Sequence, residues 1–271
     1  DAERTVGVAC TVGVGAPGSP NPTTGLHRNS NVVSMNGRPF QADVCAALGK
    51  AVRVSNDANC MALSEAVDGA AKGEPTVFGV IIGTGVGGGV VIHQRIVAGH
   101  QGIAGEWGHN PMPAGCDGAD AMGEQTECNA ACYCGRRGCI EQYLCGSALE
   151  LRYRRLAGGG AGEQALGRQA ALVRAGDLAA LAARGDLHAR ATLEWYARTL
   201  ACALGTIVNV LDPDTIVLAG GLSNIPELHV AVQRHLPPFV FSDACTTRVV
   251  RASHGDSSGV RGAAWLGRSG D

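Results

Sequence analysis

The sequence lacks any apolar run long enough to cross a membrane. Its longest runs, from Val77 to Ile82 and from Ile216 to Ala219, have the length of strands and are bounded by glycine or charge. A transmembrane helix needs about 20 consecutive apolar residues. We therefore expect no membrane partner.

The chain also lacks an excess of either positive or negative charge. The chain has 22 lysines and arginines against 24 aspartates and glutamates, which gives a net charge of −2, and it contains no like-charge run. Surfaces that bind nucleic acid usually need a basic patch or stripe. We therefore expect no nucleic acid among the partners of this chain.

No secretory leader is apparent ahead of the cysteines. The 11 cysteines form an odd set, and several, including Cys60, Cys145 and Cys202, lie within apolar segments. This pattern favours a reducing cytoplasm, with buried free thiols and one metal cluster, over a disulfide framework. The chain also opens at Asp1, close to a strand-like run, so we expect part of the protein to be missing upstream.

Strands and helices alternate along the 271 residues, of which 45% are hydrophobic. Strand patterns cover residues 4–15, 51–55, 76–83, 90–92, 215–219 and 247–253. Helical spacing covers residues 39–48, 149–156, 163–174, 178–183, 188–211 and 260–266, and a further helix follows the polar strand end at Asp57. The alternation predicts an α/β fold with mixed sheets, and the length suffices for two lobes with separate cores.

The stretch from His109 to Glu141 carries the strongest chemical signal. It contains Cys132, Cys134 and Cys139 within eight residues, turned by glycines, and one upstream imidazole at His109. Three thiolates and an imidazole form a tetrahedral zinc ligand set, and four protein ligands leave no open position for water. We expect a structural zinc ion here. The alternative is that these are four unrelated buried residues.

Asp57 stands where a polar strand end leads into a helix. A carboxylate at that position could cap the helix, because it satisfies free N–H groups and meets the positive end of the helix dipole. Spacing alone favours capping. The alternative is a general base that faces a cleft and takes a proton from a substrate hydroxyl.

Glycine-rich turns follow two of the predicted strands. Residues 83–89 read Gly-Thr-Gly-Val-Gly-Gly-Gly between two strands, and the bare N–H groups of such a hairpin can wrap phosphate oxygens. The turn is neither a Walker loop, since no Gly-Lys-Ser/Thr follows, nor a Rossmann fingerprint, since a strand rather than a helix follows. At Gly220 and Gly221 a nucleotide could approach bare backbone, or the pair could simply make a tight turn.

Together these motifs resemble the ROK family of sugar kinases. The resemblance covers nearly the whole chain and rests, in order, on Asn56-Asp-Ala-Asn59, Gly83 to Gly89, Glu106-Trp-Gly-His109, Cys132 to Glu141 and Leu218 to Asn224. Within the family the chain looks most like bacterial fructokinases that also accept mannose, followed by N-acetylglucosamine kinase and then glucokinase. The runs that favour this subfamily include Ser64 to Ala71, Phe239 to Phe241 and His254 to Trp265.

The resemblance implies an α/β, actin-like (ribonuclease H-like) fold with two lobes and a structural zinc site. The small lobe would comprise residues 1–72, completed by a C-terminal helix within 256–271. The large lobe would comprise residues 73–255 and contain the zinc-binding segment 109–141. The sugar and ATP would lie in the cleft between the lobes.

The same resemblance gives each site residue a role. Asp57 would be the catalytic base, which reverses the interpretation from spacing alone. The residues that would hold the sugar are Asn31, Asn56, Glu106, His109 and Glu141. The residues that would contact ATP are Gly83, Thr84, Gly85, Gly87, Gly220, Gly221 and Asn224. The ligands of the structural Zn²⁺ would be His109, Cys132, Cys134 and Cys139, and Mg²⁺ would bridge the ATP phosphates.

The activity implied is ATP-dependent phosphorylation of a hexose by a cytoplasmic homodimer. D-fructose, converted to fructose 6-phosphate, is the first choice and mannose a second substrate, with N-acetylglucosamine kinase or glucokinase activity as the alternative. The Asp-x-Gly-Gly-Thr phosphate turn with which these kinases begin has no match in residues 1–15. An inactive fragment, a sugar-binding pseudokinase or the body of a repressor is therefore the alternative of another class.

Overall fold

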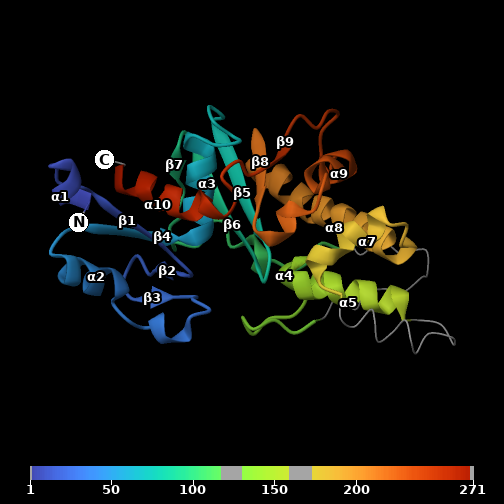
Figure 1. The fold of residues 1–271 in the computed structure, drawn as a ribbon, viewed down its shortest axis with the longest axis horizontal. Coiled ribbons are helices and arrows are strands. Elements are labelled where there is room, and N and C mark those ends of the chain that lie inside the picture. Colours follow the sequence, from blue (N-terminus) through green and yellow to red (C-terminus); the bar gives the residue numbers. More distant parts are fainter. Residues whose placement is uncertain (1, 117–129, 159–172, 269–271) are drawn as a thin grey trace. The chain divides into compact units, whose positions relative to one another are not determined.

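The computed structural model describes residues 2–116, 130–158 and 173–268 (Figure 1). The chain forms two compact units. Unit 1 comprises Asp1–Gly79, Gly88–Gly105 and Ala252–Asp271, and unit 2 comprises Val80–Gly87 and Glu106–Arg251. The predicted α/β class is confirmed, while the lobes expected at 1–72 with 256–271 and at 73–255 stay a prediction.

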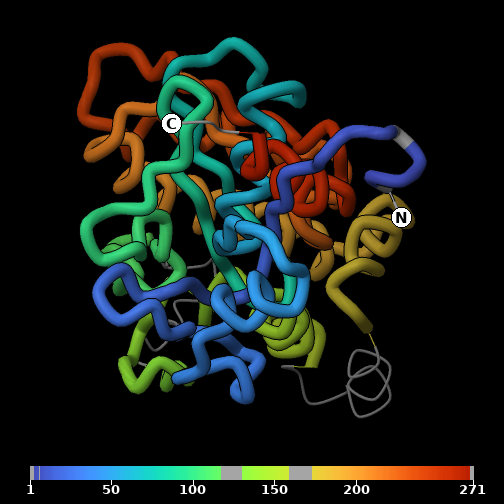
Figure 2. Tube along the Cα trace, turned by 90° about the vertical axis from the view of Figure 1, so that its left-hand side faces the viewer, coloured from blue at the N-terminus to red at the C-terminus, as the bar shows by residue number. Residues whose placement is uncertain are grey.

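Unit 1 is built around a pair of parallel strands. β1 (Val12–Ala16) pairs with β4 (Val52–Asn56) from Val12↔Val52 to Ala16↔Asn56. α10 (Ser258–Arg268) packs on β1 and on α3 (Asp57–Val67), and Figure 2 shows the blue strand beside the red helix. Glycine permits this packing, because a Cβ at Gly262 would lie 1.6 Å from the carbonyl oxygen of Cys60.

Shorter elements complete unit 1. α2 (Phe40–Leu48) falls where the helix was predicted, and it ends at Gly49, whose φ of +63° suits glycine. The segment 19–36 contains the antiparallel pair β2 (Ser19–Pro20) and β3 (His27–Arg28) and the single turn η1 (Val33–Met35).

A five-stranded sheet has the order β7-β6-β5-β8-β9. Its strands are β5 (Thr76–Ile82), β6 (Val86–Ile92), β7 (Arg95–Ile96), β8 (Thr215–Ala219) and β9 (Arg248–Arg251). β6 and β7 are antiparallel, whereas β8 and β9 are parallel. The apolar run predicted as a strand at 76–83 is β5, and three of its side chains, Val77, Val80 and Ile82, are fully buried.

Helices make up much of unit 2. They are α4 (Glu141–Leu144), α5 (Gly146–Ala157), α7 (Leu178–Ala183), α8 (Leu187–Leu211) and α9 (Leu228–His235). α8 begins after Asp186, whose carboxylate accepts a hydrogen bond from the Ala189 N–H at 2.9 Å. The buried Tyr196 hydroxyl donates to the carbonyl of Leu144 at 2.8 Å and so ties α8 to α4. The helix predicted at 163–174 lies almost entirely outside the described residues.

None of the helices that the structure describes combines the length and the apolar character that a membrane crossing would need.

The first predicted strand begins too early. Ala2–Val6 is a short helix, α1, and β1 starts only at Val12. Glu3 holds this start in place, because its carboxylate accepts a hydrogen bond from the Cys10 N–H at 2.6 Å and pairs with Lys50. A contact with a residue so far along the chain leaves no trace in the local alternation from which the strand was predicted.

The expectation of free thiols outside the metal cluster is wrong for one pair. Cys116 and Cys202 form a disulfide, with their Cα atoms 5.4 Å apart and a separation of 86 positions in sequence. Cys60 and Cys145 are free and buried, as predicted. The pairing depends on which buried segments pack against each other, and sequence spacing does not reveal that.

Candidate active site

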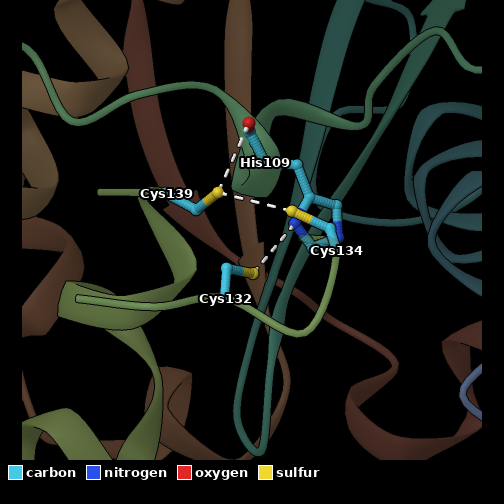
Figure 3. A group of neighbouring side chains, drawn as sticks. All are labelled: His109, Cys132, Cys134 and Cys139. Carbon is cyan, nitrogen blue, oxygen red and sulfur yellow. Dashed lines mark hydrogen bonds between the residues drawn. The ribbon is translucent and has the colours of Figure 1, made fainter. Parts of the chain in front are cut away.

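The four predicted zinc ligands of unit 2 converge on one point (Figure 3). We call His109, Cys132, Cys134 and Cys139 the zinc-ligand cluster. Its ligand atoms all lie within 4.8 Å of one another, and the Cys134 and Cys139 sulfur atoms are 3.6 Å apart. Sulfur atoms bound at 2.3 Å to a tetrahedral zinc ion would be about 3.8 Å apart, so the cluster fits that ion in both chemistry and size.

The backbone around the cluster is irregular and held by hydrogen bonds. Cys132 N–H donates to the Arg136 carbonyl at 2.8 Å, and Gly138 N–H donates to Ala130 at 2.9 Å. Gly138 has a φ of +70°, a conformation in which glycine carries no steric cost. These turns explain how three cysteines within eight residues can face the same point.

His109 ends the single turn η2 (Trp107–His109) and presents two different ring edges. Its Nδ1 lies 3.6 Å from the Cys132 sulfur, and its Nε2 lies 3.0 Å from the Tyr133 hydroxyl. The two rings meet edge to face, with centroids 5.2 Å apart. A metal on Nδ1 would fix the tautomer and leave Nε2 to the polar groups on the other side.

Glu141 is the first residue of α4, two positions after the last ligand cysteine. It is 9% exposed, and its Oε2 accepts a hydrogen bond from the Val86 N–H at 3.0 Å. Gly85 allows this contact, since a Cβ there would lie 2.7 Å from the same oxygen. The predicted sugar-binding carboxylate and the glycine turn therefore meet directly.

Tyr133 contacts His109, one of the predicted sugar-binding groups of unit 2. Although the residue is 71% exposed, partial loss of solvent around the phenol raises its pKa to about 12, and nearby negative charge, chiefly that of Glu141, adds to the rise. The Nε2 of His109 contacts this hydroxyl directly, whereas Glu106 and Glu141 act on it only through their charge. Sequence reasoning missed Tyr133 as a site residue, although its place between two ligand cysteines was a usable signal.

The two predicted nucleotide turns lie side by side in unit 2. A Cβ at Gly83 would stand 3.7 Å from the Gly221 nitrogen, and one at Gly220 would stand 2.5 Å from the carbonyl oxygen of Ile82. Gly220 also has a φ of +84°. Thr84, at the tip of the first turn, is exposed. The structure thus brings bare backbone from two distant segments together, as a phosphate or ribose site requires.

Two members of the predicted nucleotide set have structural partners. Gly87 lies within β6, and its carbonyl accepts a hydrogen bond from the Trp107 indole at 2.9 Å. Asn224 is exposed at the end of η4 (Gly221–Asn224), and its side-chain oxygen accepts a hydrogen bond from Arg251. A contact between ATP and either residue stays a prediction.

In unit 1 the helix cap falls on Asn56 rather than Asp57. The Asn56 Oδ1 accepts a hydrogen bond from the Ala58 N–H at 2.8 Å, and its amide reaches the Gly18 carbonyl at 3.4 Å. Asp57 is the first helical residue, and its own Oδ1 lies 2.9 Å from the same N–H. Asn56 therefore supplies the cap, while the Asp57 carboxylate also accepts a hydrogen bond from the Ala58 N–H at the start of the helix, and the role of Asp57 as catalytic base stays a prediction.

The Asp57 carboxylate lines a cavity of about 900 Å³ within unit 1, together with Gly13 to Gly15 of β1 and Gly259 of α10. Loss of surrounding water raises the pKa of this carboxyl, and backbone hydrogen bonds offset part of the rise. A more basic carboxylate beside a cavity is suited to general-base chemistry.

Asn31 is exposed on the segment before η1, and its role in binding the sugar stays a prediction.

Comparison with known proteins agrees with these motifs. The chain is 39% identical over 266 residues to an N-acetyl-D-glucosamine kinase from Yersinia pseudotuberculosis, and the match covers 98% of this chain and 83% of that protein. The solved structure of a ROK family glucokinase from Streptomyces griseus, in complex with glucose and AMPPNP, matches with a TM-score of 0.77 at 27% identity, covering 97% of this chain and 83% of the other.

A ROK hexokinase from Thermus thermophilus matches equally well, with a TM-score of 0.77 at 30% identity, covering 98% of this chain and 81% of the other. The predicted actin-like fold is confirmed by these structures. The sequence profile of the ROK family matches residues 1–269. The chain therefore belongs to the ROK family.

Proposed function

We propose that this protein is an ATP-dependent sugar kinase whose preferred substrate is N-acetyl-D-glucosamine. The observation that supports the proposal is the zinc-ligand cluster, which contains His109, together with the hydrogen bond that holds the nearby Glu141 against the glycine turn at Val86. The choice of sugar rests on the 39% identity to an N-acetyl-D-glucosamine kinase over 98% of the chain. This substrate replaces D-fructose, which the motifs alone placed first.

The groups of unit 2 would hold the sugar. Carboxylates and an imidazole nitrogen accept hydrogen bonds from hydroxyls, so Glu106, Glu141 and the Nε2 of His109 suit a polyhydroxylated ligand. The Val86 N–H fixes Glu141 before any sugar arrives. A zinc ion on the four ligands would supply a rigid cross-link without an open coordination position.

Asp57 would act as the general base. Its carboxylate would take the proton of the attacking sugar hydroxyl, which then bonds to the γ-phosphorus of ATP as ADP leaves. Because the pKa of Asp57 is raised, activity should increase with pH as the carboxyl ionises and should fall when it is protonated. Phosphoryl transfer otherwise depends on positioning and charge stabilisation.

The nucleotide would bind the glycine turns of unit 2. The Gly83 N–H already donates to the Gly85 carbonyl at 3.0 Å, so the N–H groups of Thr84 and Gly85 would contact phosphate oxygens. The bare backbone at Gly220 and Gly221 would accept the ribose or base. When bound with ATP, Mg²⁺ would neutralise part of the phosphate charge.

A panel of sugars tests the proposal. ADP release should be measured with N-acetyl-D-glucosamine, N-acetyl-D-mannosamine, glucose, mannose and fructose, and kcat/KM should be highest for the first. Asp57→Asn should lower kcat by about a thousandfold while calorimetry still detects sugar binding. Asp43→Asn, on the surface of α2, is the matched control and should keep wild-type rates.

Other results would point elsewhere. Full activity in Asp57→Asn would remove Asp57 from the chemistry. A preference for fructose would restore the substrate that the motifs favoured. Sugar binding without ADP release for every sugar would indicate a sugar-binding protein rather than a kinase.

A further inference from the structure

Glu65 is a fully buried carboxylate that the proposed mechanism does not use. It lies on α3, the helix that begins with Asp57, and its exposure is 0%. Its Oε1 accepts hydrogen bonds from the His254 N–H at 3.0 Å and the Ser258 hydroxyl at 2.8 Å. Its Oε2 accepts from the Ala70 N–H at 2.8 Å and the Ser253 N–H at 2.9 Å. We call these five residues the Glu65 bracket.

The four donors of the Glu65 bracket are neutral, yet they stabilise the anion. Burial alone would raise the pKa of Glu65, but the hydrogen bonds from Ala70, Ser253, His254 and Ser258 outweigh burial and hold it below its usual value. A carboxylate that accepts several backbone N–H groups remains charged even in an apolar setting. The side chain is therefore a permanent acceptor for all four donors.

Three of the four donors belong to one segment. Ser253, His254 and Ser258 lie between β9 and the first residue of α10, so Glu65 fastens this segment to α3. A second contact, whose side chains are 21% and 25% exposed, joins the same parts, since the His254 Nε2 lies 3.0 Å from the Asp68 carboxylate. The buried anchor is Glu65.

The fastened segment borders the cavity that Asp57 lines. Asp256, within the segment, and Gly259, just after it, contribute to the wall of that cavity. The backbone contact of Gly262 with Cys60 adds a rigid connection between α10 and α3. The place of this wall relative to Asp57 is thus set by α3, α10 and the buried carboxylate between them.

We infer that Glu65 is a positioning residue for phosphoryl transfer, because it holds residues 253–258 at a fixed place beside the Asp57 cavity. The inference rests on the proposed kinase function. Its structural part, the bracket itself, can be measured without any activity.

Two substitutions break the bracket by different means. Glu65→Gln replaces one acceptor oxygen with an amide donor that faces backbone N–H groups. Gly69→Ala keeps the charge, but its Cβ would lie 2.2 Å from the Glu65 Oε2 and displace the carboxylate. Matched controls are Asp43→Asn on exposed α2 and Gly176→Ala, whose Cβ would have nothing within 4 Å.

Hydrogen exchange then measures whether the hydrogen bonds of the bracket are intact, and enzyme kinetics measure whether the bracket supports catalysis. In both variants the Ser253 and His254 amides should exchange about a hundredfold faster than in the wild type. Turnover per folded molecule should fall about tenfold with the KM for sugar within about threefold, a split that loss of stability alone would not give. If either variant fails to fold, Ser258→Ala, which removes one donor, should show the same pattern with a loss of about threefold.

Three results would overturn the inference. Unchanged exchange at Ser253 and His254 would show that no bracket exists. Faster exchange with kcat within about twofold of the wild type would make Glu65 a purely structural residue. If the wild type phosphorylates no sugar while exchange still accelerates in the variants, the proposed function fails, and the positioning role fails with it although the bracket stands.

Discussion

Two regions of the molecule fix acidic side chains in place by different means. In the zinc segment of unit 2, the described residues 109–116 and 130–141 are mostly irregular backbone, cross-linked by clustered metal ligands and by a disulfide at Cys116, and Glu141 follows the last ligand. The Glu65 bracket of unit 1 joins two packed helices and relies on one buried anion. Irregular backbone has no helix face to pack, so cross-links replace the apolar contacts that regular elements provide.

Metal removal should give the largest effect and should separate the two regions. Incubation with a chelator, or Cys139→Ser, should lower the free energy of unfolding of unit 2 by more than about 5 kcal/mol, because structural zinc contributes folding energy directly. Sugar affinity should fall with it. Zinc content, urea unfolding and calorimetry measure these changes. Cys245→Ser, outside the cluster, is the control.

If chelation has no such effect, the zinc segment is not held by a metal ion, and the contrast with the Glu65 bracket is wrong. Protein purified without chelator that contains no zinc, or that keeps its stability after chelation, would show that the zinc-ligand cluster is held by packing alone. Hydrogen exchange at Ser253 and His254 should stay unchanged in the chelated protein, since the Glu65 bracket has no metal ligand.

Loss of the disulfide should have the second largest effect on stability. Cys202→Ser, or reduction of the wild type, should lower the free energy of unfolding by about 2–4 kcal/mol, the usual contribution of a disulfide that closes a long loop. Urea unfolding with and without reductant measures it. Thiol titration of the unfolded, unreduced wild type should give at least two fewer thiols than the 11 cysteines of the sequence. A count of 11 would contradict the pairing.

Ser258→Ala probes the second region on a smaller scale. The lost hydrogen bond to a buried anion should cost about 1–2 kcal/mol at neutral pH. Since the pKa of Glu65 is lowered on folding, its stabilisation is present above its unfolded value of 4.5 and is lost as pH falls through the folded pKa. The difference between variant and wild type should therefore shrink in acid. A difference independent of pH would mean that the Ser258 hydroxyl acts without the charge.

Tyr133→Phe should have the smallest effect. The side chain is 71% exposed, so removing its hydroxyl should change the free energy of unfolding by less than about 0.5 kcal/mol. Loss of the contact with the His109 Nε2 should alter sugar affinity by no more than about threefold. Calorimetry on the zinc-loaded protein measures it. If Tyr133→Phe lowered the free energy of unfolding or the sugar affinity as much as Cys139→Ser does, Tyr133 would be needed to hold the zinc segment in place.

The sequence was informative where chemistry is local. Cys132, Cys134 and Cys139 lie so close in the chain that their convergence could be predicted from spacing, and the structure adds His109 to them as expected. β5 and α8 were readable because apolar periodicity records which face of an element is buried.

Features that depend on tertiary contacts could not be predicted from the sequence. The disulfide joins positions 86 apart, and the bracket joins Glu65 to residues near 254, with no spacing rule for either. The cap at Asn56 was missed because asparagine and aspartate both cap well, and only the backbone geometry decides between neighbours. α1 depends on a contact between Glu3 and Lys50 that no local pattern encodes.

The two ring nitrogens of His109 would allow ligand binding to be followed by absorption spectroscopy. Cobalt(II) accepts the same tetrahedral nitrogen and sulfur ligands as zinc, and its visible absorption depends on the ligand field. Because Nδ1 faces the cysteine sulfur atoms while Nε2 faces outward to Tyr133, a molecule that binds at Nε2 would polarise the ring and shift the colour of the metal. Sugar binding could then be followed by visible absorption spectroscopy of the cobalt-substituted protein.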